Sequence, residues 1–214
     1  MSTKIGLISD PHADPGPVAE ALQIFKREGV EQILCAGDIG GYGEQLDETI
    51  SLLQQQQVQA IRGNHEEWAL QREIFPGSQA AREYYESLPT FISQTIEGVR
   101  LYMVHAEPPD KNTHGLRLFD QHGEVIPEVL AEWRQRLEGA GYDVLILGHT
   151  HQVYEIRLTD TLVINPGSSA YNHSCAILSL PDLTVEWFAL SGKSIEKTWN
   201  WGVNQVRGGQ SRQT

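Results

Sequence analysis

The sequence predicts an α/β sandwich, in which mixed β-sheets are covered by helices on the outside. Two observations carry this prediction. Strand-like and helix-like segments alternate through the N-terminal half, and strand-like segments dominate after residue 143. In addition, 214 residues can bury one sizeable core, and no internal repeat or linker divides the chain. We therefore expect a single domain over residues 1–201.

Short apolar runs predict the first strands of this sandwich, and apolar residues at helical spacing predict the helices between them. The first predicted strands cover residues 4–9, 32–36 and 58–61. The predicted helices of this half cover residues 17–28, 46–57, 66–73 and 79–87. Gly29 closes the first helix, and Pro89 follows the last.

The second half begins with a predicted hairpin, residues 91–96 and 99–104, which turns at Glu97-Gly98. Residues 108–121 have little periodicity and are expected to form a loop, ahead of a helix over residues 125–137. The remaining predicted strands cover residues 143–147, 153–158, 162–165, 175–180 and 184–190. Residues 202–214 are polar and Gly-rich, so we expect a flexible tail there.

Composition excludes several classes of protein. Hydrophobic residues make up 40% of the chain and charged residues 21%, which is typical of a globular protein. No apolar run reaches the ~18 residues that span a bilayer, and the N-terminus does not resemble a signal peptide. We therefore expect a cytoplasmic protein without membrane association. The net charge of −12 argues against stable nucleic-acid binding. The composition leaves the oligomeric state open, a homo-oligomer included.

Residues that can bind a metal follow one apolar run after another. Ligands of open α/β sheets bind just beyond the carboxyl ends of strands, so these side chains should meet at one rim. Singly, each has an ordinary explanation as a turn, cap or surface residue. Together they predict a metal site. The candidate ligands are Asp10, His12, Asp38, Asn64, His105, His149 and His151.

The chemistry of these candidates indicates which metals they would bind. They offer nitrogen and oxygen atoms and no thiolate, which suits Mn²⁺, Fe, Zn²⁺ or Co²⁺ better than a structural zinc site. Seven ligands are too many for one ordinary mononuclear site and suit two metals that share a carboxylate. His114, His122 and His173 follow no such run. We expect them in exposed loops, with a substrate groove as the alternative for His114 and His173.

Five blocks in this order resemble the calcineurin-like metallophosphoesterase superfamily, and in particular its small bacterial and archaeal phosphodiesterases. The resemblance extends from residue 5 to about residue 170 and is specific because all five blocks occur in sequence. The blocks are Asp10-x-His12, Gly37-Asp38, Gly63-Asn64-His65-Glu66, His105 and Gly148-His149-Thr150-His151.

The resemblance implies a four-layer α/β/β/α sandwich and two divalent metal ions. Mn²⁺ is the first choice, with Fe, Zn²⁺, Co²⁺ or Ni²⁺ as alternatives. It implies that Asp10, His12, Asp38 and His151 bind one ion, and that Asp38, Asn64, His105 and His149 bind the other. A hydroxide bridging the two ions would then attack a phosphodiester or a small phosphorylated substrate. His65 would contact the phosphate or protonate the leaving group.

One departure from the family bears on the substrate. Related protein phosphatases carry an Asp-Arg pair shortly after the Gly-Asp block, where this chain has Gly41-Tyr42. The missing arginine favours a diester, which carries less charge than a monoester. A phosphomonoesterase or protein phosphatase is the alternative. Asn64, His65 and Arg62 are the predicted substrate contacts, and Arg117 is a second candidate to replace the missing arginine.

Two further interpretations stay open. A non-catalytic scaffold of the same fold tends to lose a metal ligand or the histidine after the asparagine, whereas this chain keeps both. The segment Asn165-Pro166-Gly167-Ser168 also matches relatives, and it predicts either a tight turn or a substrate contact.

Overall fold

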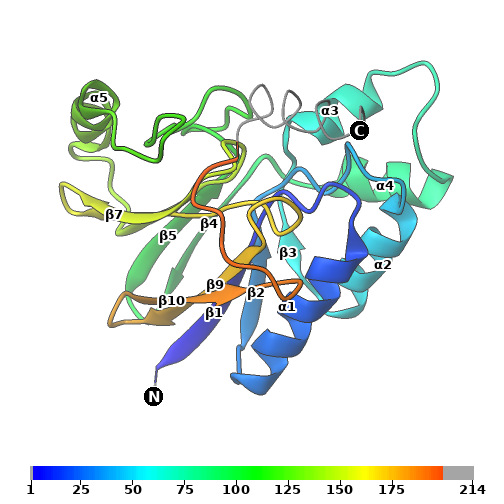
Figure 1. Ribbon diagram of the computed structural model, residues 1–214, viewed down its shortest axis with the longest axis horizontal. Helices are drawn as coiled ribbons and strands as arrows, with labels where there is room; N and C mark the ends of the chain where they lie inside the picture. The colour runs from blue at the N-terminus through cyan, green and yellow to red at the C-terminus, as the bar shows by residue number, and fades with distance from the viewer. Residues whose placement is uncertain (1, 200–214) are drawn as a thin grey trace, which may run out of the picture.

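Two five-stranded sheets pack face to face in the computed structural model of the protein, which describes residues 2–199 (Figure 1). Both sheets mix parallel and antiparallel pairs. The first sheet contains, in spatial order, β10 (Thr184–Ala189), β9 (Ser174–Leu180), β1 (Thr3–Ile8), β2 (Gln32–Cys35) and β3 (Gln59–Ala60). The second contains β4 (Phe91–Ile96), β5 (Val99–Val104), β6 (Val144–Ile146), β8 (Thr161–Pro166) and β7 (Val153–Leu158).

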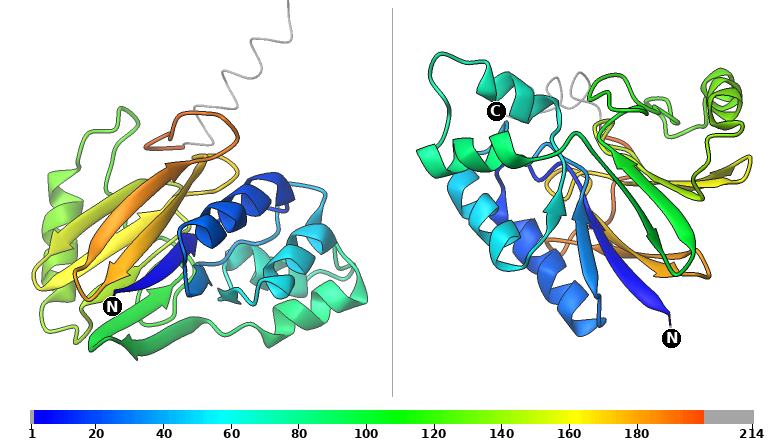
Figure 2. Two further views of the ribbon diagram at one scale, coloured as in Figure 1. Left: turned by 90° about the horizontal axis from the view of Figure 1, so that it is seen from below. Right: turned by 180° about the vertical axis from the view of Figure 1, so that it is seen from behind.

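The helices cover the outer faces of the two sheets. They are α1 (Pro15–Arg27), α2 (Leu46–Gln55), α3 (Asn64–Leu70), α4 (Gln79–Ser87) and α5 (Pro127–Leu137). Residues of α1, α2 and α4 pack on the first sheet, and Trp133 and Leu137 of α5 pack on the second. Figure 2 shows α1 and α5 on opposite sides of the paired sheets. The predicted four-layer α/β/β/α sandwich is therefore confirmed.

Three apolar clusters hold these layers together. The middle cluster joins the inner faces of the two sheets, with Leu7 and Leu34 from the first and Met103 and Ile146 from the second. These four side chains are almost completely buried. Burial stabilises each of them by roughly 1.5–3 kcal/mol relative to exposure, so the inter-sheet layer is a major source of stability.

All the helices and strands predicted from the sequence are present within the described residues, with shifts at their ends. Helix α1 begins at Pro15 rather than residue 17, because Asp14 caps it by accepting a hydrogen bond from Gly16 N at 3.2 Å. Helix α3 covers residues 64–70 rather than 66–73, so Asn64 is its first residue. The predicted hairpin turns at Glu97 and Gly98, which both have positive φ, as in a type I′ turn.

Three further features concern the tail, membrane-spanning helices and the cysteines. The predicted flexible tail, residues 202–214, lies outside the described residues. Within residues 2–199 there is no helix with the length and apolar character that crossing a membrane requires. Cys35 and Cys175 are both buried and free.

An ion pair joins β5 to the start of β6 and predicts a pH effect on stability. Arg100 Nη2 lies 2.8 Å from Asp143 Oδ1, and Arg100 Nε lies 3.1 Å from Oδ2. These hydrogen bonds lower the pKa of Asp143 to about 2. A lowered carboxylate pKa stabilises the folded state above the unfolded value and loses that effect as the pH falls. Asp143→Asn should therefore be slightly less stable than the parent at pH 6, since the pair is exposed.

Urea unfolding of both proteins at pH 6 and pH 2.5 checks this prediction. The difference in free energy of unfolding should shrink at the lower pH, as Asp143 approaches its folded pKa of about 2. An equal difference at both pH values would contradict it.

Candidate metal centre

The seven predicted ligands meet at one edge of the two sheets, although they come from five separate segments of the chain. Asp10 and His12 follow β1, and Asp38 follows β2. Asn64 opens α3, His105 follows β5, and His149 and His151 follow β6. All are buried except His149, which is partly exposed.

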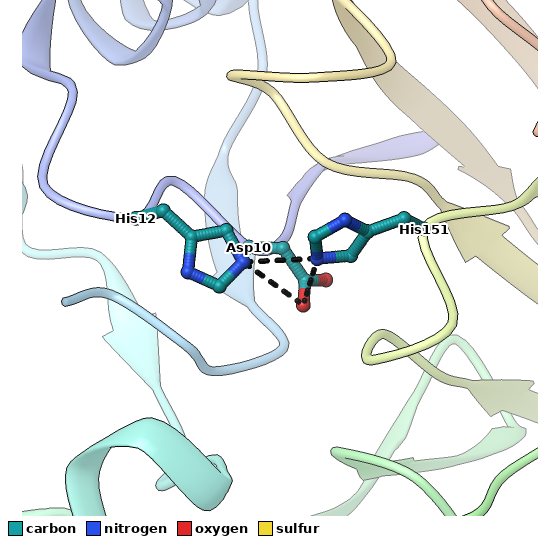
Figure 3. A group of neighbouring side chains, drawn as sticks. All are labelled: Asp10, His12 and His151. Carbon is teal, nitrogen blue, oxygen red and sulfur yellow. Dashed lines mark hydrogen bonds and ion pairs between the residues drawn. The ribbon is translucent and has the colours of Figure 1, made fainter. Parts of the chain in front are cut away.

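Asp10, His12 and His151 form the first group of candidate ligands (Figure 3). The Nε2 atoms of the two histidines lie 2.9 Å apart. Asp10 Oδ1 lies 3.4 Å from His151 Nε2 and 4.0 Å from His12 Nε2. The two rings and the carboxylate therefore point toward one another from the loop after β1 and the loop after β6, as Figure 3 shows.

A second group gathers around Asp38 and Asn64. Asp38 Oδ1 lies 3.3 Å from His105 Nε2. Asn64 Oδ1 lies 3.2 Å from the same nitrogen and 2.8 Å from His149 Nδ1. Asp38 is also within 4.8 Å of His12. It therefore lies between the two groups, where a carboxylate shared by two ions has to be.

Backbone carbonyls fix which ring nitrogens face the centre. His12 Nδ1 lies 2.9 Å from Gly40 O, and His105 Nδ1 lies 2.6 Å from Ala36 O. A carbonyl oxygen only accepts hydrogen bonds, so each Nδ1 carries the proton and donates it. In the neutral rings, the Nε2 lone pairs then point into the centre, as in many metal sites. Oxygen and nitrogen donors that converge in this way fit divalent cations.

The pKa values of these groups suit ligation at neutral pH. Burial lowers the pKa of His12 and of His149 to about 4, so both rings are neutral. Burial opposes charge on Asp10 and Asp38 too, but the neighbouring histidines outweigh it and lower both carboxyl pKa values. His105 differs: burial disfavours its charge, yet Asp38 raises its pKa to about 10. A metal ion would therefore have to displace a proton from His105.

The backbone around these ligands is strained. Five of the seven have a positive φ, a conformation that costs a residue with a side chain roughly 1–3 kcal/mol. They are Asp10, His12, Asp38, His149 and His151, with φ between 47° and 65°. Such strain persists where function requires it. Five of the thirteen non-glycine residues with a positive φ in the described part of the chain are therefore candidate ligands.

Two glycines let the chain approach the ligands closely. A Cβ atom on Gly63 would lie 2.2 Å from Asp38 Oδ1, and one on Gly148 would lie 2.2 Å from Ser9 Oγ. Ser9 in turn donates a short hydrogen bond to Asp10. Any larger residue at either position would displace a carboxylate of the centre.

Glu66 is a structural residue of the site that the sequence interpretation did not assign. Its fully buried carboxylate accepts hydrogen bonds from the backbone N–H groups of Asp38 (2.9 Å), Gly63 (2.8 Å) and Gly40 (3.1 Å). Burial and the nearby Asp38 raise its pKa to about 7. A glutamate three residues after the N-cap position of a helix, as in a capping box, was the available signal.

Glu66→Ala should weaken both folding and metal binding. It leaves three buried N–H groups without an acceptor, which predicts a loss of about 3 kcal/mol or more in the free energy of unfolding. Loss of support for Asp38 should also weaken metal binding about 10- to 100-fold. Urea unfolding and titration with Mn²⁺ measure the two effects. The matched control is Glu67→Ala, and similar losses in both variants would refute this role for Glu66.

The segment 165–168 is hydrogen-bonded to the backbone of the loops that carry the candidate ligands. Asn165 Nδ2 donates to Gly148 O at 2.9 Å, and Ser168 Oγ donates to Asp10 O at 2.6 Å. Both side chains are fully buried. Two interpretations of this segment were open, a tight turn and a contact with substrate. The structure favours the turn, which orients the loops that carry the candidate ligands.

A cavity of about 220 Å³ opens onto the two ligand groups. Besides five of the candidate ligands, it is lined by Tyr42, Trp68, Arg117, Thr150 and Trp199. His65 also lines it, with Nε2 4.0 Å from Asp38 Oδ2. Burial lowers the pKa of His65, although Asp38 opposes that shift.

Two basic side chains were candidates for this cavity, and only one of them lines it. The guanidinium of Arg62 donates to the carbonyls of Glu86 (3.1 Å) and Leu88 (3.2 Å), so it is held away from the cavity. Arg117 lines the cavity and has no carboxylate partner among the described residues. Of the two arginines, only Arg117 is therefore placed to reach a molecule in this cavity, and the predicted substrate contact of Arg62 stays a prediction. His114, His122 and His173 do not line the cavity.

Comparisons with known proteins identify the family of the chain. The model of the calcineurin-like phosphoesterase superfamily domain matches residues 3–181. An uncharacterized protein of Methanocaldococcus jannaschii is 25% identical over 167 residues, which are 71% of this chain and 63% of that protein. The match therefore spans less than two thirds of that relative. A phosphodiesterase of the same organism is 26% identical over 77% of this chain and 82% of its own length.

A solved structure shares the fold across nearly the whole chain. The metallophosphoesterase of Sphaerobacter thermophilus superposes with a TM-score of 0.68, covering 98% of this chain and 95% of that one. The sequences are 19% identical, so this likeness is evidence for the fold alone.

Proposed function

The chain belongs to the calcineurin-like phosphoesterase superfamily, and we propose that it is a dinuclear metal-dependent hydrolase of phosphodiesters or small phosphorylated substrates. The position of Asp38 between two groups of donor atoms carries the proposal. One ion would take Asp10, His12, Asp38 and His151. The other would take Asp38, Asn64, His105 and His149. Mn²⁺ is the ion we expect first, with Fe, Zn²⁺, Co²⁺ or Ni²⁺ as alternatives.

When bound, two divalent cations lower the pKa of a water that they share and neutralise the oxygens of a phosphoryl group. The chain's own residues position the substrate. Arg117 is available to pair with a phosphoryl oxygen, since it has no carboxylate partner among the described residues. His65 lines the same cavity and would contact the phosphate or give a proton to the leaving oxygen. Glu66 accepts hydrogen bonds from the backbone N–H groups of Asp38 and Gly63 and so fixes the two segments that lie next to His65.

The surroundings of His65 favour a diester. Tyr42 stands in the sequence where related protein phosphatases carry an arginine, and its ring centroid is 4.7 Å from that of His65. Arg117 is the cavity's one arginine among the described residues. A diester carries one charge less than a monoester and needs less positive charge to bind. The phosphodiesterase relative is in accord with this choice.

Hydrolysis of bis(p-nitrophenyl) phosphate and p-nitrophenyl phosphate by the Mn²⁺-loaded protein tests the proposal. We expect a higher kcat/KM for the diester, and loss of turnover with a chelator. A strong preference for the monoester would replace the proposal with a phosphomonoesterase. No turnover of either ester, together with no metal bound after purification, would refute the hydrolase and favour a non-catalytic scaffold.

A further inference from the structure

A second pocket lies directly beside the metal centre. Its volume is about 330 Å³, within the range of small-molecule sites. It shares Tyr42, His65 and Trp68 with the cavity over the ligands, so the two are joined at His65. Glu44 and Arg72 complete the polar part of its lining, and Leu46 contributes to the apolar part.

Two aromatic side chains at this junction are unusually exposed. Tyr42 is 48% exposed and Trp68 is 50% exposed, and they are two of only five large hydrophobic residues exposed within residues 2–199. They come from different elements, the loop after β2 and helix α3. Their ring centroids lie 4.7 and 5.1 Å from that of His65. Exposed aromatic rings at the mouth of a polar pocket are typical of ligand contacts.

The position of the second pocket connects it with the reaction. His65 lines both the cavity over the candidate ligands and the second pocket. A phosphoryl group bound in the first cavity would therefore place an ester substituent that extends past His65 in the second pocket. If His65 gives its proton to the leaving oxygen, as proposed above, that substituent is the leaving group.

The lining also indicates the chemistry of that group. Flat aromatic surfaces bind flat rings by stacking, and base-on-aromatic stacking is tolerant of the base. Glu44 and Arg72 have no ion-pair partner among the described residues, so one accepts and the other donates hydrogen bonds at the pocket. A nucleoside offers a flat ring together with both donors and acceptors. An alkyl alcohol offers no ring.

We propose that the second pocket is the leaving-group subsite, and that it takes a nucleoside through stacking on Tyr42 and Trp68. The inference rests on the proposed hydrolase function. Water adds to phosphorus, the bond from phosphorus to the nucleoside oxygen breaks, and that oxygen takes a proton. From a diester the products are a phosphomonoester and a free nucleoside.

Binding of adenosine to the metal-free protein tests the subsite without any chemistry. Ligand-detected NMR or calorimetry should show adenosine binding, with ribose binding much more weakly. Trp68→Ala and Tyr42→Ala should each weaken adenosine binding about 5- to 100-fold. Trp68→Phe keeps a flat ring and should restore most of the affinity. The matched control is Phe91→Ala, which removes an exposed aromatic residue on β4, outside both pockets.

Turnover gives the second readout. Adenosine should raise the KM of the Mn²⁺-loaded protein for bis(p-nitrophenyl) phosphate without changing kcat, and Trp68→Ala should lose this inhibition. Equal binding of ribose and adenosine, or unchanged binding in both alanine variants, would overturn the subsite. Failure of the hydrolase itself would look different: adenosine would bind, no ester would turn over, and the leaving-group role would fall.

Discussion

Asp38→Ala should lower kcat/KM for a phosphodiester by at least about 10³-fold and abolish the binding of two metal ions per chain. Within residues 2–199, Asp38 is the one carboxylate grouped with donor atoms of both sets, and its Oδ1 lies 3.3 Å from His105 Nε2. Metal ions stabilise the charge of a phosphoryl transition state by several kcal/mol, and each 1.36 kcal/mol is tenfold in rate. Loss of the shared ligand should remove most of that stabilisation.

Steady-state kinetics and metal analysis of the purified variant measure the two effects. Asp38→Asn keeps the shape of the side chain but removes its negative charge. It should behave like Asp38→Ala, because a ligand shared by two cations has to be negatively charged. Asp160→Ala removes an exposed carboxylate outside the cavity and should leave kinetics and metal content unchanged. Two tightly bound ions in Asp38→Ala, or more than a tenth of the parent activity, would be incompatible with a shared Asp38.

Hydrophobic periodicity was enough to predict the sandwich, because buried strands and amphipathic helices leave regular apolar patterns. The same patterns located the candidate ligands, since most of them lie within a few residues of the end of a buried apolar strand. Asp10 after β1 and His105 after β5 are examples. The sequence placed these residues at strand ends. Because the carboxyl ends of neighbouring parallel strands share one edge of a sheet, residues at those ends could be expected to lie together.

Features that depend on the path of loops could not be predicted in this way. The loop between β5 and α5 has no periodicity, and its course brings Arg117 to the cavity. Arg62, adjacent to the ligand block in sequence, is instead held by the carbonyls of Glu86 and Leu88. Local spacing does not report such contacts between distant segments. The placement of both Tyr42 and Trp68 against His65 has the same origin.

Metal binding should stabilise the folded protein strongly. At free Mn²⁺ about 100-fold above the dissociation constant, each site adds about 2.7 kcal/mol, so two sites add roughly 5 kcal/mol. For a chain of this length, that corresponds to a rise in Tm of roughly 10–20 °C. The physical reason is that the ions bind the folded chain and not the unfolded one, because donor atoms such as the Nε2 atoms of His12 and His151, 2.9 Å apart, converge only in the folded protein.

Thermal unfolding of chelator-treated protein with and without Mn²⁺ measures this stabilisation. Mg²⁺ should have a much smaller effect, because four of the proposed ligands are histidines and Mg²⁺ prefers oxygen. Asp38→Ala should lose most of the Mn²⁺ effect, whereas Asp160→Ala should retain it. A Tm that moves by less than about 2 °C with Mn²⁺ would show that these donors do not form a metal site.

The stabilisation should also grow as the pH rises from 6.5 to 8.5, and His105 supplies the reason. Burial disfavours a charged His105, but Asp38 outweighs burial and raises its pKa to about 10 in the metal-free protein. A raised histidine pKa stabilises the metal-free fold below the unfolded value of 6.5, and that contribution declines as the pH rises toward about 10. A metal ion competes with the same proton, so its binding strengthens over the same interval. His12 and His149, with pKa values of about 4, are already neutral and do not make metal binding depend on pH in this interval.

Calorimetry in buffers of different ionisation enthalpy should therefore detect about one proton released on metal binding at pH 7, with His105 as its source. No release would mean that the metal does not displace a proton from His105.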